Sequence, residues 1–464
     1  MKYSNQQTMS DTMRSFLLIF FCSILWFGCK PNASETPIED NSLDWVENAT
    51  IYEVNLRQYS EDGDIDNFIP HLDRLSDLGV DVLWFMPIHP IGVVNRKALG
   101  DVFAQDIADT TERKKYLGSP YSVRDYRAVN PDFGTAEDFR NLVKACHEKG
   151  FKVLIDWVGN HTSFDHKWIT DHPEWYTHKD GVITDPLNAD GESIGWTDVA
   201  DLNYENKELW KAMTADMKFW VDSCDIDGFR CDVAFEVPAE FWRFAVGELR
   251  KSKNVFMLAE AQDHNMELFD GTFDAYYAWS VHHFMNELTK GNITADSFIQ
   301  EWMKMDTTFG EKAFPMNFIT NHDENSWNGT IAERMGDNWQ AAAVLSFALK
   351  GMPLIYSGQE VGLNHRLKFF EKDLINWDID TIGSSQAFYK SLAALKGKPS
   401  LGISKPIVMA VENKLLTVQR GQINFVFNFT VDTLEQGFPT GQKNVTSYLW
   451  DKQKLAPGGY YIEY

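Results

Sequence analysis

Four apolar segments of this sequence each end in polar residues that could carry out acid–base or nucleophilic chemistry. One of them, Gly228–Asp232, places an arginine two positions before an aspartate. The positive charge of Arg230 favours the ionised form of Asp232, and an ionised, positioned aspartate suits a nucleophile. The other segments run from Val153 to Asp156 and on to His161, from Phe256 to Glu260 and from Phe318 to Asp323.

Glu260 has a different setting from Asp232. It follows four apolar or small residues, Phe256 to Ala259, so we expect its surroundings to raise its pKa. A carboxyl group with a raised pKa holds a proton that it can give to a leaving group. One ionised and one protonated carboxyl group, about 5–5.5 Å apart, are what the hydrolysis of a glycosidic bond with retention requires.

The elements that position these residues read as a parallel α/β sheet. The apolar segments have strand length, and helical segments separate them. In a (β/α)8 TIM barrel the C-terminal ends of the strands form one face, so the polar ends are predicted to converge there. We expect eight strands, at residues 51–57, 80–86, 153–156, 228–232, 255–260, 273–279, 314–320 and 352–357.

The order of these motifs resembles that of the α-amylase family of glycoside hydrolases (glycoside hydrolase family 13). The resemblance covers roughly residues 45 to 395. Within the family, the chain is similar to a bacterial α-amylase of the secreted or lipoprotein type. The motifs are Asp-x-x-x-Asn-His at 156–161, Gly-Phe-Arg-x-Asp at 228–232, a strand ending in glutamate at 260, and Asn-His-Asp at 321–323.

The resemblance implies a role for each of these side chains. Asp232 would be the nucleophile, and Glu260 the general acid that later acts as a base. Asp323 would be a third carboxylate that holds sugar hydroxyls, and Asp156 would support the arginine and histidine network from beneath. Substrate contacts are implied for Tyr121, His161, Arg230 and His322.

The reaction implied by the resemblance is hydrolysis of internal α-1,4-glucosidic bonds of starch and maltooligosaccharides through a covalent glycosyl-aspartate intermediate. Ser122 stands where glucosidases of this family often carry an aspartate that grips the chain end, and this favours attack within a chain. A cyclomaltodextrinase, a neopullulanase or an α-glucosidase of the same family is an alternative. A non-catalytic glucan-binding relative is a further one, but such relatives commonly lose one or more acids that are all present here.

Calcium is the cofactor that the resemblance implies, at Asn160, because this position often ligates a structural ion between the barrel and a small inserted domain. Glu236 replaces the usual histidine partner, and Phe235 replaces a lysine of the neighbouring subsite, so the calcium site and the glucan preference stay open. The carboxylate-rich turn Asp62–Asp66 could also bind calcium through oxygen ligands. A solvated turn that caps a helix is the favoured interpretation of that turn.

Two further domains accompany the predicted barrel of residues 45–161 and 206–397. Prolines and glycines loosen the pattern at residues 162–205, which we interpret as the small domain B of this family, inserted after the third strand. The charged segment 101–115 looks like an insertion along one edge of the cleft. Residues 398–464 alternate between apolar and polar, which predicts an all-β, β-sandwich-like C-terminal domain. Aromatic residues of domain B that could stack on sugars or pack this domain are Trp168, Trp175, Tyr176 and Trp196.

The first residues of the chain predict export. Phe16–Phe27 is an apolar run of 12 residues, which is too short to span a bilayer as a mature helix. We interpret residues 1–28 as a lipoprotein-type signal peptide, with Cys29 lipidated after cleavage and residues 29–44 as a tether. The protein would then be anchored in a bacterial cell envelope, in the periplasm or at the cell surface, or be secreted. An ordinary cleaved signal and an uncleaved anchor are alternatives.

The composition argues against some partners. A formal net charge of −24 and a pI near 4.9 disfavour nucleic acid, whose phosphates need a basic surface, whereas an uncharged glucan is indifferent to that charge. Membrane contact is expected only through the lipid anchor at Cys29. Cys146, Cys224 and Cys231 are expected to be buried free thiols, because their number is odd and they lie in predicted helices or strands.

Overall fold

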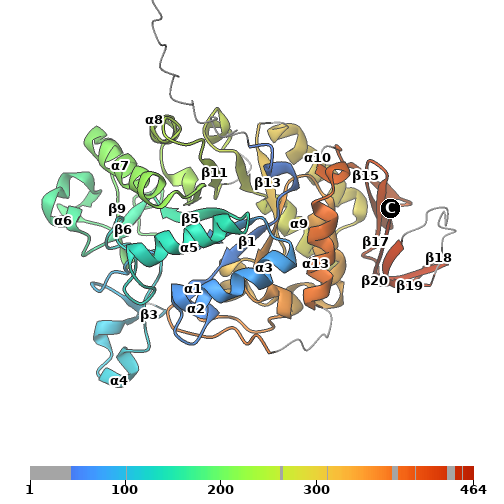
Figure 1. Ribbon diagram of the computed structural model, residues 1–464, viewed down its shortest axis with the longest axis horizontal. Helices are drawn as coiled ribbons and strands as arrows, with labels where there is room; N and C mark the ends of the chain where they lie inside the picture. The colour runs from blue at the N-terminus through green and yellow to red at the C-terminus, as the bar shows by residue number, and fades with distance from the viewer. Residues whose placement is uncertain are drawn as a thin grey trace, which may run out of the picture. The chain divides into compact units, whose positions relative to one another are not determined.

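The computed structural model describes residues 43–100, 102–261, 265–310, 312–378, 385–402, 404–435, 445–451 and 453–464. Eight parallel strands close into a barrel in the order β1-β14-β13-β12-β11-β10-β5-β2 (Figure 1). The predicted (β/α)8 TIM barrel is therefore confirmed. Its strands are β1 (Ile51–Val54), β2 (Val82–Phe85), β5 (Lys152–Val158), β10 (Gly228–Asp232), β11 (Phe256–Ala259), β12 (Ala275–Tyr277), β13 (Phe314–Asn317) and β14 (Met352–Tyr356).

Alternation along β10 aims its polar residues into the barrel. Phe229 and Cys231 belong to the apolar core that the strands share with the surrounding helices. Successive side chains of a strand point to opposite faces, so Arg230 and Asp232 point inward. The strand begins at Gly228, where a Cβ atom would lie 1.9 Å from a backbone oxygen of β11, so only glycine permits this close pairing.

The same alternation operates on neighbouring strands. Ile51 of β1 and Leu258 of β11 belong to the apolar core inside the barrel. Glu53 and Glu260 stand two positions after them and therefore also point inward. A carboxyl group is thus carried to the upper end of the barrel interior by each of these strands.

Helices surround the barrel (Figure 1). The long ones are α3 (Leu72–Leu78), α5 (Ala136–Glu148), α7 (Lys207–Cys224), α8 (Ala239–Leu249), α9 (Trp279–Thr289), α10 (Ala295–Phe309), α12 (Trp339–Ala348) and α13 (Ser385–Lys396). The short ones are α1 (Leu56–Tyr59), α2 (Ile65–Phe68), α4 (Thr110–Arg113), α6 (Lys167–Asp171), α11 (Ile331–Met335) and α14 (Pro399–Gly402).

Six of the eight strands are shorter than the sequence predicts and β5 is longer, and for β1 and β12 the reason is a helix that begins early. β1 ends at Val54 instead of residue 57, because helix α1 begins at Leu56. β12 is confined to Ala275–Tyr277 instead of 273–279, because helix α9 begins at Trp279. In both places the apolar pattern continues past the strand, since the following helical turn is also packed against the core.

Two segments between barrel strands lie near the site described below. After β5, the segment expected to be domain B contains β6 (His161–Ser163), β7 (His178–Lys179), β8 (Val182–Ile183) and β9 (Val199–Asp201), and β6 pairs with β9 in antiparallel fashion. After β2, the strands β3 (Lys97–Leu99) and β4 (Val102–Phe103) form an antiparallel hairpin. This hairpin overlaps the charged insertion predicted at 101–115.

The C-terminal strands form an additional antiparallel sheet, of order β15-β16-β17-β20-β18 with β19 on β20. Its described strands make one sheet, so the two packed sheets that "β-sandwich-like" suggests are not seen there. Arg420 ties the sheet to the barrel by donating to the carbonyl groups of Ala348 and Leu349, which end α12. The strands are β15 (Ile407–Val411), β16 (Leu415–Arg420), β17 (Ile423–Asn428), β18 (Leu434–Glu435), β19 (Val445–Trp450) and β20 (Lys454–Glu463).

The predictions for the leader, including the signal peptide, Cys29 and nearly all of the tether, concern residues outside the described ranges. Within those ranges, no helix is both long and apolar enough to cross a bilayer. Cys146, Cys224 and Cys231 are buried free thiols, as predicted.

Candidate active site

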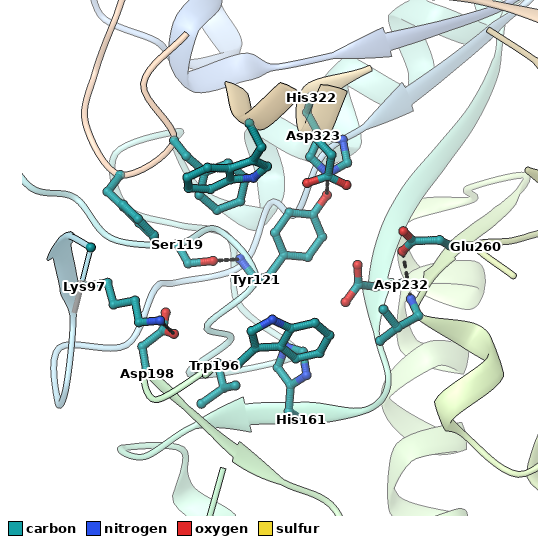
Figure 2. A pocket seen from close by; sticks show the side chains of 16 residues that line it. Lys97, Ser119, Tyr121, His161, Trp196, Asp198, Asp232, Glu260, His322 and Asp323 are labelled. Carbon is teal, nitrogen blue, oxygen red and sulfur yellow. Dashed lines mark hydrogen bonds and ion pairs between the residues drawn. The ribbon is translucent and has the colours of Figure 1, made fainter. Parts of the chain in front are cut away.

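A cavity of about 420 Å³ lies where the barrel strands end (Figure 2). Asp232 is the last residue of β10, and Glu260 directly follows β11. Both line the cavity together with Asp323, which follows β13. Tyr121, His161 and His322 line it as well, whereas Arg230 and Asn160 are not among its lining residues.

Arg230 lies beneath the cavity and is completely buried. Its Nη1 is 2.8 Å from Oδ1 of Asp232 and 2.8 Å from Oδ1 of Asp156, and its Nη2 is 2.6 Å from Oε2 of Glu260. Its Nε donates to the hydroxyl group of Tyr277. The substrate contact expected for Arg230 is therefore replaced by contacts with the carboxylates, which a planar guanidinium can hold in fixed directions.

The pKa of Asp232 reflects two opposing effects. Burial raises this pKa, and although Arg230 lowers it, the net direction is upward. Arg230 therefore favours the ionised form of Asp232, as expected, while desolvation opposes this effect and sets the net direction of the pKa. Burial also raises the pKa of Glu260, against the opposing charge of Arg230, and this agrees with the expectation for Glu260.

Glu53 is a site residue that the sequence reasoning missed. Its Oε1 lies 2.5 Å from Nδ1 of His322, and both side chains are buried. Burial lowers the pKa of His322, but Asp323 and Glu53 raise it, to about 9. His322 is therefore protonated at neutral pH. The available signal was a single carboxylate inside the apolar strand β1.

His322 also connects two cavity-lining groups. Its Nε2 lies 2.8 Å from the hydroxyl oxygen of Tyr121 and 3.2 Å from Oδ2 of Asp323. The Tyr121 ring stacks on the imidazole ring at a centroid distance of 5.4 Å. Asp156 accepts from the Tyr121 hydroxyl group and from Arg230, so it supports this network from beneath as the resemblance implies.

His161 differs from His322 in charge. Burial lowers the pKa of His161 to about 4, so its imidazole is neutral at pH 7. Its ring meets that of Trp196 edge to face at 5.6 Å, and Trp196 also lines the cavity. A neutral imidazole can both donate to and accept from hydroxyl groups.

Aromatic side chains supply much of the remaining wall. Trp327 is 52% exposed, lines the cavity and contacts Phe369 at a ring distance of 5.1 Å. The sequence reasoning missed Trp327 because it lies in a π-helical turn, Glu324–Asn328, that directly follows Asp323. Of the domain B aromatics, Trp196 reaches the cavity, while the others are buried in packing: Trp168, Trp175 and Tyr176.

Asn160 is the residue at which calcium is predicted. The Asn160 side chain is buried, and its amide nitrogen lies 3.4 Å from Nδ1 of His161. Burial raises the pKa of Asp201 to about 6, and Glu236 adds to this. The described part of the chain contains no group of three or more His, Cys, Asp or Glu side chains that could hold a metal ion. Calcium at Asn160 stays a prediction and would need amide and backbone oxygens.

The turn at Asp62–Asp66 behaves as a helix cap. Asp64 accepts a hydrogen bond of 2.8 Å from the backbone N–H of Asn67 at the start of α2. This is the interpretation that the sequence favoured.

Comparison with known proteins agrees with the fold. The family model for the alpha amylase catalytic domain matches residues 38–190 and 193–387. "Alpha-amylase MalA" of Haloarcula japonica is 26% identical over 377 residues, covering 78% of this chain and 51% of its own length. "Alpha-1,4-glucan:maltose-1-phosphate maltosyltransferase" of Picrophilus torridus is 29% identical over 327 residues, covering 67% of this chain and 48% of its own.

A solved structure extends the comparison. The crystal structure of an alpha-amylase from Lactobacillus plantarum has a TM-score of 0.75 and 29% identity, covering 90% of this chain and 99% of its own. By contrast, the matched part of this chain spans only about half the length of the two curated relatives from Haloarcula japonica and Picrophilus torridus. Since the family model covers most of the chain and matches the barrel strands that carry the three carboxylates, the chain belongs to the alpha-amylase family of glycoside hydrolases.

Proposed function

We propose that this protein hydrolyses internal α-1,4-glucosidic bonds of starch-like glucans and maltooligosaccharides with retention of configuration. The observation that carries the proposal is the shared cavity of Asp232, Glu260 and Asp323, with one buried guanidinium bonded to the first two. Retaining glycosidases use a nucleophilic carboxylate and an acid–base carboxyl group held close together.

In the first step, a carboxylate oxygen of Asp232 forms a bond to the anomeric carbon as the bond to the leaving oxygen breaks. Glu260 gives its proton to that leaving oxygen. In the second step, water attacks the same carbon and gives a proton to Glu260, and the bond to Asp232 breaks. Asp323 and the charged His322 bind hydroxyl groups of the reacting sugar in both steps.

The hydrogen bonds of Glu260 favour one oxygen as the acid. The guanidinium of Arg230 and the backbone N–H of Val233 both donate to Oε2, at 2.6 and 3.0 Å. An oxygen that accepts two such bonds is a poor place for a proton. The transferable proton would therefore be carried by Oε1.

The alternatives differ in the acceptor and in the products. A glycosyl-aspartate intermediate can pass its sugar to water or to another sugar, and one relative bears the name of a maltosyltransferase. A cyclomaltodextrinase, a neopullulanase or an α-glucosidase would share the same three carboxylates. A binding protein without activity is disfavoured because all three carboxylates are present and meet in one cavity.

Product analysis on soluble starch tests the proposal. We expect a rapid loss of viscosity, mixed maltooligosaccharides, and α-anomers as the first products in proton NMR spectra. Glucose alone, released from chain ends, would contradict internal cleavage, and β-anomers would contradict retention. Larger oligosaccharides formed from maltose would indicate transfer.

The nucleophile is tested separately. Asp232→Asn should abolish hydrolysis while leaving glucan binding intact, and Asp222→Asn, on the exposed face of α7, should leave turnover unchanged. Normal turnover by Asp232→Asn would refute the assignment.

Export and lipid anchoring at Cys29 are part of the proposal and are supported by the apolar run Phe16–Phe27 that ends in Gly28-Cys29. A Cys29→Ala variant should fail to incorporate labelled fatty acid in a bacterial host. After cell fractionation, the variant should no longer be found with the membranes. Equal labelling of both proteins would contradict the anchor.

A further inference from the structure

An ion pair stands at one end of the cavity, away from the acid. Lys97, in the β3–β4 hairpin, and Asp198, directly before β9, are 9% and 6% exposed, and both line the cavity. Figure 2 shows the two side chains close together, on the far side of Tyr121 from Glu260. They come from two different excursions of the chain, after β2 and after β5.

The contacts of this pair leave hydrogen-bonding capacity toward the cavity. Nζ of Lys97 donates to the carbonyl oxygen of Gly195 at 2.6 Å and lies 3.9 Å from Oδ1 of Asp198. The second distance is too long for a direct hydrogen bond. An ammonium group has three N–H donors and a carboxylate has about four acceptor positions, so a hydroxyl group can accept from Lys97 and donate to Asp198 at once.

The side chain of Ser122 holds the backbone at Asp198 in place. Oγ of Ser122 donates to the carbonyl oxygen of Asp198 at 3.0 Å, and Ser122 is buried. The carboxylate therefore projects from a fixed backbone. A preorganised charged group of this kind forms stronger hydrogen bonds to hydroxyls than a neutral one does.

The position of the pair defines which part of a glucan it meets, and this step rests on the proposed function. Glu260 protonates the leaving group, so the leaving sugar lies on the side of Glu260. The glycone continues in the opposite direction, past Tyr121 and His161. We propose that Lys97 and Asp198 bind the hydroxyl groups of a glycone sugar beyond the one attached to Asp232, and that this subsite makes cleavage depend on glycone length.

A series of 4-nitrophenyl α-glycosides with one, two, three and four glucose units tests this subsite. All members have the same leaving group and differ only in the glycone. The measured quantity is the ratio of kcat/KM for the best long glycone to kcat/KM for the shortest glycone that the native protein cleaves. Loss of a charge-assisted hydrogen bond should lower this ratio roughly tenfold to a hundredfold in Asp198→Asn.

Lys97→Met should lower the same ratio. Lys97 also donates a hydrogen bond to the carbonyl oxygen of Gly195, so the thermal unfolding of the Lys97→Met variant is measured in parallel. Asp198→Asn is the more direct test. The matched controls Lys115→Met and Asp190→Asn change exposed charges of the same two excursions, and both should keep the native ratio.

The outcomes are distinguishable. An unchanged ratio in a folded Asp198→Asn protein, or an equal loss on every glycone, would overturn the subsite while leaving the proposed hydrolysis intact. Failure of the native protein to cleave any member of the series or starch would overturn the proposed function itself.

Discussion

The side chains of Arg230 and Glu260 form a buried ion pair, with Nη2 and Oε2 2.6 Å apart. The other terminal nitrogen of the same guanidinium lies 2.8 Å from Asp232. One rigid, planar group therefore fixes the directions of both carboxyl groups on which the proposed reaction depends. The relative placement of the proposed nucleophile and acid depends on this arginine as much as on the two strands.

Arg230→Lys should lower kcat by about a hundredfold or more and change KM little. A lysine keeps the charge but is a point donor that cannot reach both carboxylates in fixed directions, and a misplaced catalytic group costs on this order. Steady-state kinetics on maltooligosaccharides would measure the effect. Arg243→Lys, on an exposed ion pair of α8, is the control, and native kcat in Arg230→Lys would show that the guanidinium geometry is dispensable.

Glu53→Gln should shift the alkaline limb of the pH profile of kcat/KM to lower pH. Glu53 contributes to the raised pKa of His322, about 9, so without it His322 loses its proton at a lower pH. The stabilisation from this raised pKa is complete below about pH 6.5 and is lost as pH rises through about 9. The difference in melting temperature between native protein and variant should therefore shrink over that window.

The control for this experiment is Glu61→Gln, which changes an exposed carboxylate that follows α1. An alkaline limb that stays in place in Glu53→Gln would mean that another group sets it.

Trp327→Ala should raise KM for maltooligosaccharides by roughly tenfold with kcat nearly unchanged. The indole is 52% exposed and lines the cavity, and an aromatic contact of this kind contributes on the order of 1 kcal/mol. Phe244→Ala, an exposed aromatic residue of α8 outside the cavity lining, should leave KM unchanged. A fall in kcat alone would indicate that Trp327 positions Asp323 instead.

Glu324→Gln should destabilise the turn that carries Asp323 and Trp327. Oε2 of Glu324 lies 3.1 Å from Nε2 of His282 and 3.4 Å from Nη1 of Arg334. Burial raises the pKa of Glu324, but His282 and Arg334 lower it, to about 2. The stabilisation from this depressed pKa is present above the unfolded value near 4.3 and is lost as pH falls through about 2.

Urea unfolding at pH 7 should therefore show a loss on the order of 2 kcal/mol in Glu324→Gln. The difference from the native protein should diminish as the pH is lowered below 4.3 toward 2. A difference that grows on acidification would contradict the role of the ionised Glu324.

Calcium bound at Asn160 should stabilise the folded protein against thermal unfolding. If the ion binds only the folded protein, a concentration of about a hundred times Kd adds roughly 2.7 kcal/mol, so EDTA should lower Tm and added calcium should restore it. Asn160→Ala should remove this calcium dependence, whereas Asp62→Ala should keep it. Loss of the dependence in Asp62→Ala would instead assign the ion to the turn at Asp62–Asp66.

Part of the site could be predicted because strand direction and side-chain alternation are local. Parallel strands bring their C-terminal ends to one face, so carboxylates at the ends of β10 and β11 had to meet. Strand boundaries were less predictable, since the apolar pattern of residues 51–57 serves both β1 and the packed helix α1.

By itself, the sequence determined the order of the motifs and the position of each carboxylate at or after the end of a strand. Because the C-terminal ends of parallel strands meet at one face, it also determined that Asp232, Glu260 and Asp323 share one end of a barrel. The tertiary structure alone decided the partner of His322, which is Glu53, 269 residues away. It also decided the net direction of the Asp232 pKa, because burial depth is a property of the closed barrel. The meeting of Lys97 with Asp198 is of the same kind, since two excursions from the barrel must first fold over the same cavity.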